Sequence, residues 1–169
     1  MTVEYRNAGT RDAEALAELG RRSFVETFGH LYTPEDLAIF LANHSVESWA
    51  QELADPAFAI RIGEVGGKAV AYAKIGPPKL PFEPRGKAVE LRQFYVLSDW
   101  HGSGAAGELM RWVLETARRL GGDDLYLSVF VDNPRARAFY AKHGFVEEGR
   151  YAFMVGTHAD EDIVMRLPL

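Results

Sequence analysis

Residues 88–106 read AVELRQFYVLSDWHGSGAA, and this stretch decides the fold. Its first half is rich in apolar and aromatic side chains and predicts a β-strand. Small residues then open a long amphipathic helix that we expect over residues 103–120. The start of such a helix presents unpaired backbone N–H groups and the positive end of its dipole, so the glycines and alanines there would let a phosphate approach the backbone. Glycine spacing alone leaves a tight turn as the alternative.

The periodicity outside this stretch predicts the rest of a mixed α/β domain. A strand over residues 125–131 follows the helix, and a strand–helix–strand passage implies a parallel pair. Alternating residues on both sides of Gly66 and Gly67 indicate a β-hairpin. The other expected elements are a strand over 3–6, helices that begin after Thr10, after Thr33 and at Val46, a proline-rich loop over 77–86, a helix over 134–143 and strands around 145–154 and 163–167. We therefore predict one domain over residues 1–169, with a mixed, mostly antiparallel sheet and flanking helices.

Composition excludes several classes of protein. The formal net charge of -5 argues against a dedicated nucleic-acid binder, because phosphate recognition needs clustered Lys and Arg. The chain has no cysteine, which excludes disulfides and thiol nucleophiles, and its five histidines show no metal-ligand spacing. No apolar run approaches the roughly 18 residues of a membrane-spanning helix, and the first residues do not resemble a signal peptide. We therefore expect a cytoplasmic protein without a metal site and without a membrane or nucleic-acid partner.

The segment Gly102-Ser103-Gly104-Ala105-Ala106-Gly107 also matches the expression G-x-G-x-x-G of dinucleotide-binding folds. Those folds place the motif at the start of a parallel sheet, whereas here it follows an antiparallel hairpin. No Lys-Ser/Thr pair follows the glycines, as a P-loop would require. Both nucleotide-binding interpretations are therefore disfavoured.

Two motifs in the second half of the chain resemble the GNAT N-acetyltransferase superfamily. The loop His101-Gly102-Ser103-Gly104-Ala105-Ala106 matches the family pattern Gln/Arg-x-x-Gly-x-Gly/Ala except at its first position. The segment from Asn133 to Phe145 is similar to the family pattern Asn-x-x-Ala-x-x-Phe-Tyr-x-x-x-Gly-Phe. This resemblance implies an α/β fold whose central parallel strands splay at the cofactor site. It also implies an enzyme that moves an acetyl group from acetyl-CoA to an amine.

The resemblance also implies roles for individual residues. The strand end Phe94, Tyr95 and Val96 would offer backbone hydrogen bonds to the pantetheine arm and the acetyl carbonyl. Tyr140 would stand near the thioester sulfur and protonate the leaving thiolate, unless it is simply a core aromatic of its helix. Asn133 would contact the pantetheine or its surroundings. The loop that would hold the pyrophosphate, called the cofactor loop below, consists of His101, Gly102, Ser103, Gly104, Ala105 and Ala106.

Glu90 is the candidate general base. Strand alternation would place Glu90 on one face with Arg92 and Phe94, towards the acceptor amine. The position is similar to one at which some family members carry a catalytic glutamate. The alternative is a carboxylate that pairs with Arg92 on a solvated face. Many such enzymes need only an ordered chain of water molecules in place of a base.

The acceptor amine is indicated by weaker similarities. Residues 23–29, residues 151–156 and the following 162–165 resemble bacterial spermidine/spermine acetyltransferases of the Pai type. We therefore expect a small-molecule primary amine, best a polyamine, that reacts by direct transfer in a ternary complex. The acids that could supply the negative field for a polyamine, or could be ordinary solvated carboxylates, are Glu26, Glu35, Asp36, Glu90 and Asp162.

Other partners stay open at this point. A protein N-terminus or lysine, or the amino group of a drug or metabolite, are alternative acceptors. A non-catalytic acetyl-CoA sensor is the alternative from another class, and intact Asn133 and Tyr140 argue against it. The alternating Phe and Tyr residues of the tail suit a homodimer interface, which is common in the family.

Overall fold

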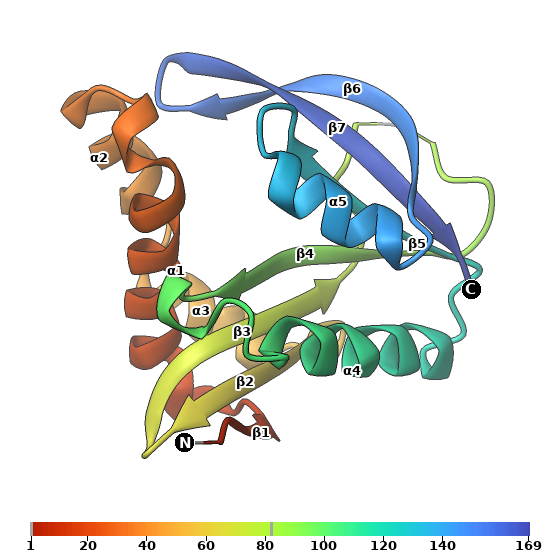
Figure 1. The fold of residues 1–169 in the computed structure, drawn as a ribbon, viewed down its shortest axis with the longest axis horizontal. Coiled ribbons are helices and arrows are strands. Elements are labelled where there is room, and N and C mark those ends of the chain that lie inside the picture. Colours follow the sequence, from red (N-terminus) through yellow and green to blue (C-terminus); the bar gives the residue numbers. More distant parts are fainter. Residues whose placement is uncertain (1, 82) are drawn as a thin grey trace.

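The β-sheet has seven strands in the order β1–β2–β3–β4–β5–β7–β6 in the computed structural model, which describes residues 2–81 and 83–169 (Figure 1). The strands are β1 (Glu4–Asn7), β2 (Ala59–Val65), β3 (Lys68–Gly76), β4 (Ala88–Val96), β5 (Asp124–Phe130), β6 (Val146–Val155) and β7 (His158–Pro168). The helices are α1 (Ala13–Phe28), α2 (Pro34–Ala42), α3 (Val46–Ala54), α4 (Ala105–Arg119) and α5 (Pro134–Lys142). This arrangement confirms the predicted mixed α/β domain.

Strand direction follows the prediction. Among the described residues, every neighbouring pair of strands is antiparallel except β4 and β5, which are parallel and joined through α4. The strand–helix–strand passage is therefore confirmed. β7 lies between β5 and β6, and the turn of the β6–β7 hairpin reaches α2 (Figure 1).

Capping side chains explain where two helical segments begin. The hydroxyl of Thr33 accepts a hydrogen bond from the backbone N of Asp36 (3.2 Å), which confirms the predicted start of α2. The predicted cap at Thr10 is wrong, because a 3-10 turn precedes α1 there. The carboxylate of Asp12, rather than a hydroxyl, accepts a hydrogen bond from the backbone N of Gly9 (2.8 Å).

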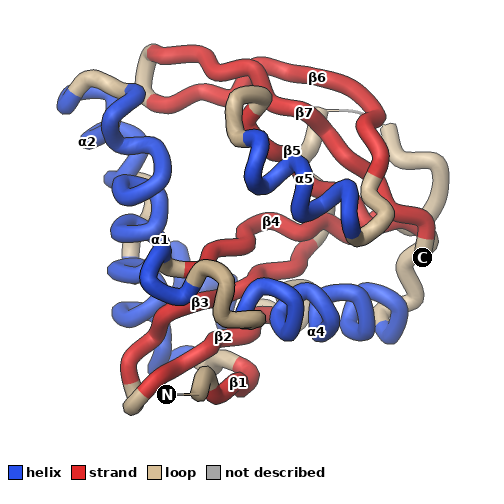
Figure 2. The backbone as a smooth tube through the Cα atoms, viewed as in Figure 1, coloured by secondary structure: helices blue, strands red, loops and turns tan. Residues whose placement is uncertain are grey.

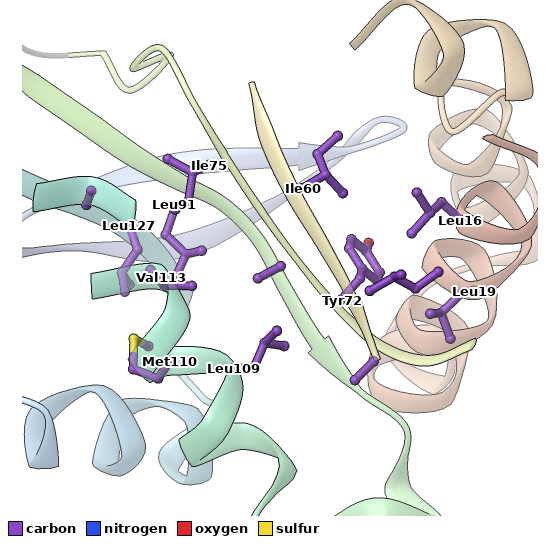
Figure 3. Close-up of a cluster of buried hydrophobic side chains, with 14 of the residues drawn as sticks. Leu16, Leu19, Ile60, Tyr72, Ile75, Leu91, Leu109, Met110, Val113 and Leu127 are labelled. Carbon is purple, nitrogen blue, oxygen red and sulfur yellow. The ribbon is translucent and has the colours of Figure 1, made fainter. Parts of the chain in front are cut away.

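The hydrophobic core has one half on each face of the sheet (Figure 3). On the face covered by α1 and α3, called the α1 face, Leu16 lies near Tyr72 of β3. On the face covered by α4 and α5, called the α4 face, Val113 lies near Leu91 of β4. Burial of a large aliphatic side chain contributes about 1.5–3 kcal/mol, so these two layers hold α1 and α4 firmly on opposite sides of β4.

Apart from the start of α1, two element boundaries differ from the prediction by two or more residues. The last strand begins at His158 rather than near Ile163, because the added residues carry acids that hide the apolar alternation. Helix α4 begins at Ala105 rather than Ser103, because the glycines before it adopt a left-handed conformation that cannot continue a helix.

Candidate active site

The two central parallel strands separate soon after they meet. The paired residues are Ala88 with Asp124, Val89 with Leu125 and Glu90 with Tyr126. Beyond them β4 pairs only with β3, and β5 only with β7 (Figure 2). The backbone groups of residues 91–96 that point towards β5 therefore lack a strand partner, and such groups need hydrogen-bond partners. We call this region the split.

A β-bulge at Arg92 sets the direction of the side chains along the split. Leu91 and Phe94 lie opposite β3 residues that are two positions apart, so both point to the α4 face. Glu90 and Tyr95 consequently point to the α1 face. The prediction that Glu90 and Phe94 share a face is wrong, because the one extra residue of the bulge resets the alternation.

The cofactor loop leaves open space at the start of α4. Gly102 has a φ of +78° and Gly104 a φ of +90°, a conformation that glycine adopts readily and other residues rarely. A Cβ built on Gly102, Gly104 or Gly107 would meet no atom within 4 Å. The 15-residue helix therefore presents its first backbone N–H groups beside unfilled space, a geometry suited to a phosphate.

His101 holds the cofactor loop against the split. Its Nε2 lies 2.8 Å from the carbonyl oxygen of Val96, the last residue of β4. The side chain that replaces the expected Gln or Arg thus contacts the backbone. This contact also uses one of the two hydrogen-bonding groups that Val96 would offer to a ligand.

Tyr140 reaches the split from α5. Its ring lies edge-on to Phe94 of β4, with 6.3 Å between the ring centroids. The residue is buried, and burial together with Tyr95 raises the pKa of its phenol well above the ordinary value. Within the described part of the chain, the hydroxyl donates to no side chain or carbonyl. It is therefore a protonated group without a partner.

Asn133 caps α5 and thereby positions Tyr140. Its side-chain oxygen accepts a hydrogen bond from the backbone N of Ala136 (3.2 Å), and Pro134 follows as the first helical residue. The side-chain oxygen of Asn133 thus has a structural role, as the N-cap of α5. The amide NH₂ is left to donate to another group.

Glu90 is buried at the root of the split. Its Oε1 accepts a hydrogen bond from the backbone N of Lys79 (2.7 Å), and its Oε2 lies 3.7 Å from Nε of Arg92. Burial raises the pKa of Glu90, against the lowering effect of these two contacts. The predicted contact with Arg92 is present, but on a buried face rather than a solvated one. The role of Glu90 as a base stays a prediction.

The acids expected to attract a polyamine have different environments. Glu26 accepts a hydrogen bond from the backbone N of Ser98 (2.7 Å), and Asp36 accepts from the backbone N of Thr157 (2.8 Å). These two carboxylates join elements of the fold through hydrogen bonds from backbone N–H groups. Asp162 is buried on the α1 face, where it lies opposite Phe130 and Tyr151 of the neighbouring strands.

Sequence reasoning missed Asp160 and Tyr32. The phenol of Tyr32 donates a hydrogen bond to Oδ2 of Asp160, and Nε2 of His158 lies 3.1 Å from Oδ1 of the same carboxylate. The available signal was the alternation of Asp160 and Asp162, which places two acids on one strand face. That signal was lost because the strand was predicted to begin later.

Other kinds of site find no support in the part of the chain that the structure describes. It contains no group of three or more His, Cys, Asp or Glu side chains that could hold a metal ion. No described helix is both long and apolar enough to cross a membrane. A hollow of about 610 Å³ lies on α1 and α3, away from the split, and is lined by Glu14, Glu18, Arg21, Arg22, Val25 and Val46.

Comparison with known proteins agrees with this geometry. Among curated relatives, a Mycobacterium tuberculosis (strain ATCC 25618 / H37Rv) protein named as an uncharacterized N-acetyltransferase is 37% identical over 155 residues, 91% of this chain and 96% of that protein. The L-amino acid N-acetyltransferase AaaT of Escherichia coli (strain K12) is 30% identical over 98% of each chain. The solved structure of the PaiA N-acetyltransferase from Thermoplasma acidophilum in complex with coenzyme A has a TM-score of 0.80 at 18% identity, over the full length of both chains.

The family follows from the match along the chain. Residues 14–145 match the model of the acetyltransferase (GNAT) family, and they include the split, the cofactor loop and Tyr140. The chain therefore belongs to the acetyltransferase (GNAT) family.

Proposed function

We propose that this protein transfers the acetyl group of acetyl-CoA to a primary amine of a small molecule, by direct transfer in a ternary complex. The observation that carries the proposal is the split, which has a helix start with open glycines beside it and Tyr140 in contact with its edge. The pyrophosphate of acetyl-CoA would lie against the first turn of α4. The pantetheine arm would follow residues 91–96 of β4, which extend over about 20 Å.

The residues of the split suit the chemistry of acyl transfer. The amine nitrogen attacks the thioester carbon, the C–S bond breaks, and coenzyme A leaves as a thiolate. Tyr140 donates its proton to that thiolate, because its raised pKa keeps the phenol protonated at neutral pH. Glu90 takes up the proton that the amine gives up, through ordered water. Its raised pKa makes Glu90 a better base near neutral pH than an exposed glutamate.

The acceptor we infer is a polyamine such as spermidine or spermine. Buried carboxylates on the α1 face favour a cationic acceptor, since opposite charge is needed to compensate them. The name of the relative AaaT favours a second candidate, an amino acid, at 30% identity. The two candidates differ in one chemical feature, a carboxylate beside the amine.

The test is to incubate the protein with acetyl-CoA and a panel of amines and to follow the release of free thiol. The panel contains spermidine, spermine, amino acids and a peptide with a free N-terminus. Turnover with spermidine or spermine would support the full proposal. Turnover only with amino acids or the peptide would keep the acetyltransferase and refute the polyamine acceptor. Tight acetyl-CoA binding without turnover of any amine would favour a sensor.

A further inference from the structure

Strand β7 carries two buried acids in different states. Asp160 and Asp162 are two positions apart, so both point to the α1 face, with exposed fractions of 8% and 7%. Asp160 is fully engaged by Tyr32 and His158. Asp162 accepts no hydrogen bond and forms no ion pair within residues 2–81 and 83–169. A buried carboxylate without a partner is costly, and proteins rarely keep one without a use for it.

Aromatic residues from several elements surround Asp162. In the sheet it lies between Phe130 of β5 and Tyr151 of β6. Burial first, and the negative charge of Asp162 as a smaller cause, raise the pKa of Tyr32, Tyr95 and Tyr151, which come from the segment before α2, from β4 and from β6. The carboxylate therefore sits among aromatic rings that an alkylammonium group can contact with its CH₂ groups and its charge.

Asp162 and the proposed proton donor Tyr140 lie on different parts of the site. Tyr140 contacts Phe94, which points to the α4 face of β4. Asp162 points to the α1 face and lies opposite Phe130, the last residue of β5. An acceptor that reaches both must carry a second cationic group at some distance from the amine that reacts.

The arginine that shares this face of β7 is already paired. Arg166, four positions along the strand from Asp162, contacts Asp124 and Glu148. A substrate carboxylate placed beside Asp162 would therefore meet two acids, and Arg166 is not free to pair with it. The electrostatics therefore oppose an amino acid as acceptor.

We propose that Asp162 binds a second, non-reacting ammonium group of the acceptor, so that the enzyme selects diamines and polyamines and rejects amines with an adjacent carboxylate. This inference rests on the proposed function, because it concerns the acceptor side of the same site. It assigns to Asp162 a role in substrate specificity, and it leaves proton transfer to other residues.

The test uses three acceptors of one carbon skeleton. 1,5-Diaminopentane carries the second ammonium group, pentylamine lacks it, and lysine adds a carboxylate to the diamine. We expect the wild-type protein to prefer 1,5-diaminopentane over pentylamine by at least about tenfold in kcat/KM, and to disfavour lysine. Asp162→Asn should abolish the preference for the diamine over pentylamine. The matched control is Glu161→Gln, which removes one charge from the exposed neighbouring position and should keep the preference.

The outcomes separate this inference from the proposed function. Equal turnover of diamine and pentylamine, or an Asp162→Asn variant that keeps the preference, would overturn the role of Asp162 while the acetyltransferase proposal stands. Absence of turnover with every amine would refute the proposed function instead. In that case the role of Asp162 is tested by measuring the Tm of the protein with coenzyme A, in the presence and absence of 1,5-diaminopentane. The diamine should raise the Tm of the wild type but not of Asp162→Asn, and equal shifts of Tm would refute the inference.

Discussion

Gly104→Ala isolates the contribution of the cofactor loop, because the substitution has a calculable cost in the protein alone. Gly104 has a φ of +90°, so any side chain there is strained by about 1–2 kcal/mol. The added Cβ would meet no protein atom within 4 Å, and therefore no clash adds to the strain. For a domain of this size we expect a fall in Tm of roughly 2–4 °C for each kcal/mol.

The effect on acetyl-CoA binding should be larger than the strain predicts. The methyl group would occupy the space in which a phosphate approaches the first backbone N–H groups of α4. Loss of one hydrogen bond to a charged group costs about 1.5–3 kcal/mol, so the Kd for acetyl-CoA should rise at least about tenfold. Gly104→Glu adds charge repulsion and should abolish binding.

The matched control is Gly67→Ala in the β2–β3 turn. Gly67 has a φ of +80° and the same open surroundings, but it lies outside the cofactor loop. Both variants should lose similar stability in urea denaturation, and only Gly104→Ala should lose affinity in calorimetric titrations with acetyl-CoA. An unchanged Kd for Gly104→Ala, or an equal loss in Gly67→Ala, would refute the assignment of the cofactor loop.

Three further predictions concern Tyr140, Glu90 and Asp162. Tyr140→Phe should lower kcat by about 10²-fold while the Kd for acetyl-CoA and the Tm stay unchanged, because the hydroxyl makes no hydrogen bond in the described structure; an unchanged kcat removes Tyr140 from the mechanism. Glu90→Gln should lower kcat/KM by about 10²-fold and remove the acidic limb of its pH profile, which for the wild type should lie above the ordinary pKa of glutamate; a retained limb would assign the base to another group. Asp162→Asn should stabilise the free protein above pH 7 by about 2 kcal/mol and not at pH 4, which urea denaturation at both pH values would measure.

The sign and size of the Asp162 effect follow from its surroundings. Burial first, and the charge of Asp160 second, raise the pKa of Asp162 from 3.8 to about 7. Between these values the unfolded chain is ionised and the folded chain holds a proton, so folding loses stability as the pH rises. The full pKa shift would correspond to a loss of about 4 kcal/mol in the free energy of unfolding. Contact of the carboxylate with solvent and with the polar rings of Tyr32, Tyr95 and Tyr151 reduces this expected loss to ~2 kcal/mol. Equal stability of variant and wild type at pH 8 would contradict the unpaired state of this carboxylate.

The fold could be predicted largely from local patterns. The capping hydroxyl of Thr33, the Gly66-Gly67 turn and the apolar stripe of α4 each depend on neighbours a few residues away, and each prediction was confirmed. The start of β7 could not be predicted in this way. Its first residues include buried acids, and Asp160 depends on a hydrogen bond from Tyr32, which lies far away in the sequence.

The side-chain directions in the site could not be predicted either, because they depend on how β4 pairs with β3. A single bulge at Arg92 separates Glu90 from Phe94, and nothing in an alternating sequence marks which residue a sheet leaves unpaired. Asn133, Tyr140 and the cofactor loop could be identified as candidates because all of them belong to motifs that resemble those of the GNAT family. Whether they act as proposed is what the variants above would measure.

Two carboxylates of the α1 face, Glu90 and Asp162, show how the separation of β4 and β5 can serve both catalysis and substrate selection. Glu90 sits where β4 still pairs with β5, and a backbone N–H from Lys79 fixes its orientation, which suits a group that must present one oxygen for proton transfer. Asp162 sits at the far end of β5, opposite its last residue Phe130, and has no such anchor. A buried carboxylate without a hydrogen-bond donor costs more free energy than one that accepts a hydrogen bond, so it also gains more free energy when a cation binds to it. The distance between base and binding acid along the split would then set the length of diamine that the enzyme acetylates best.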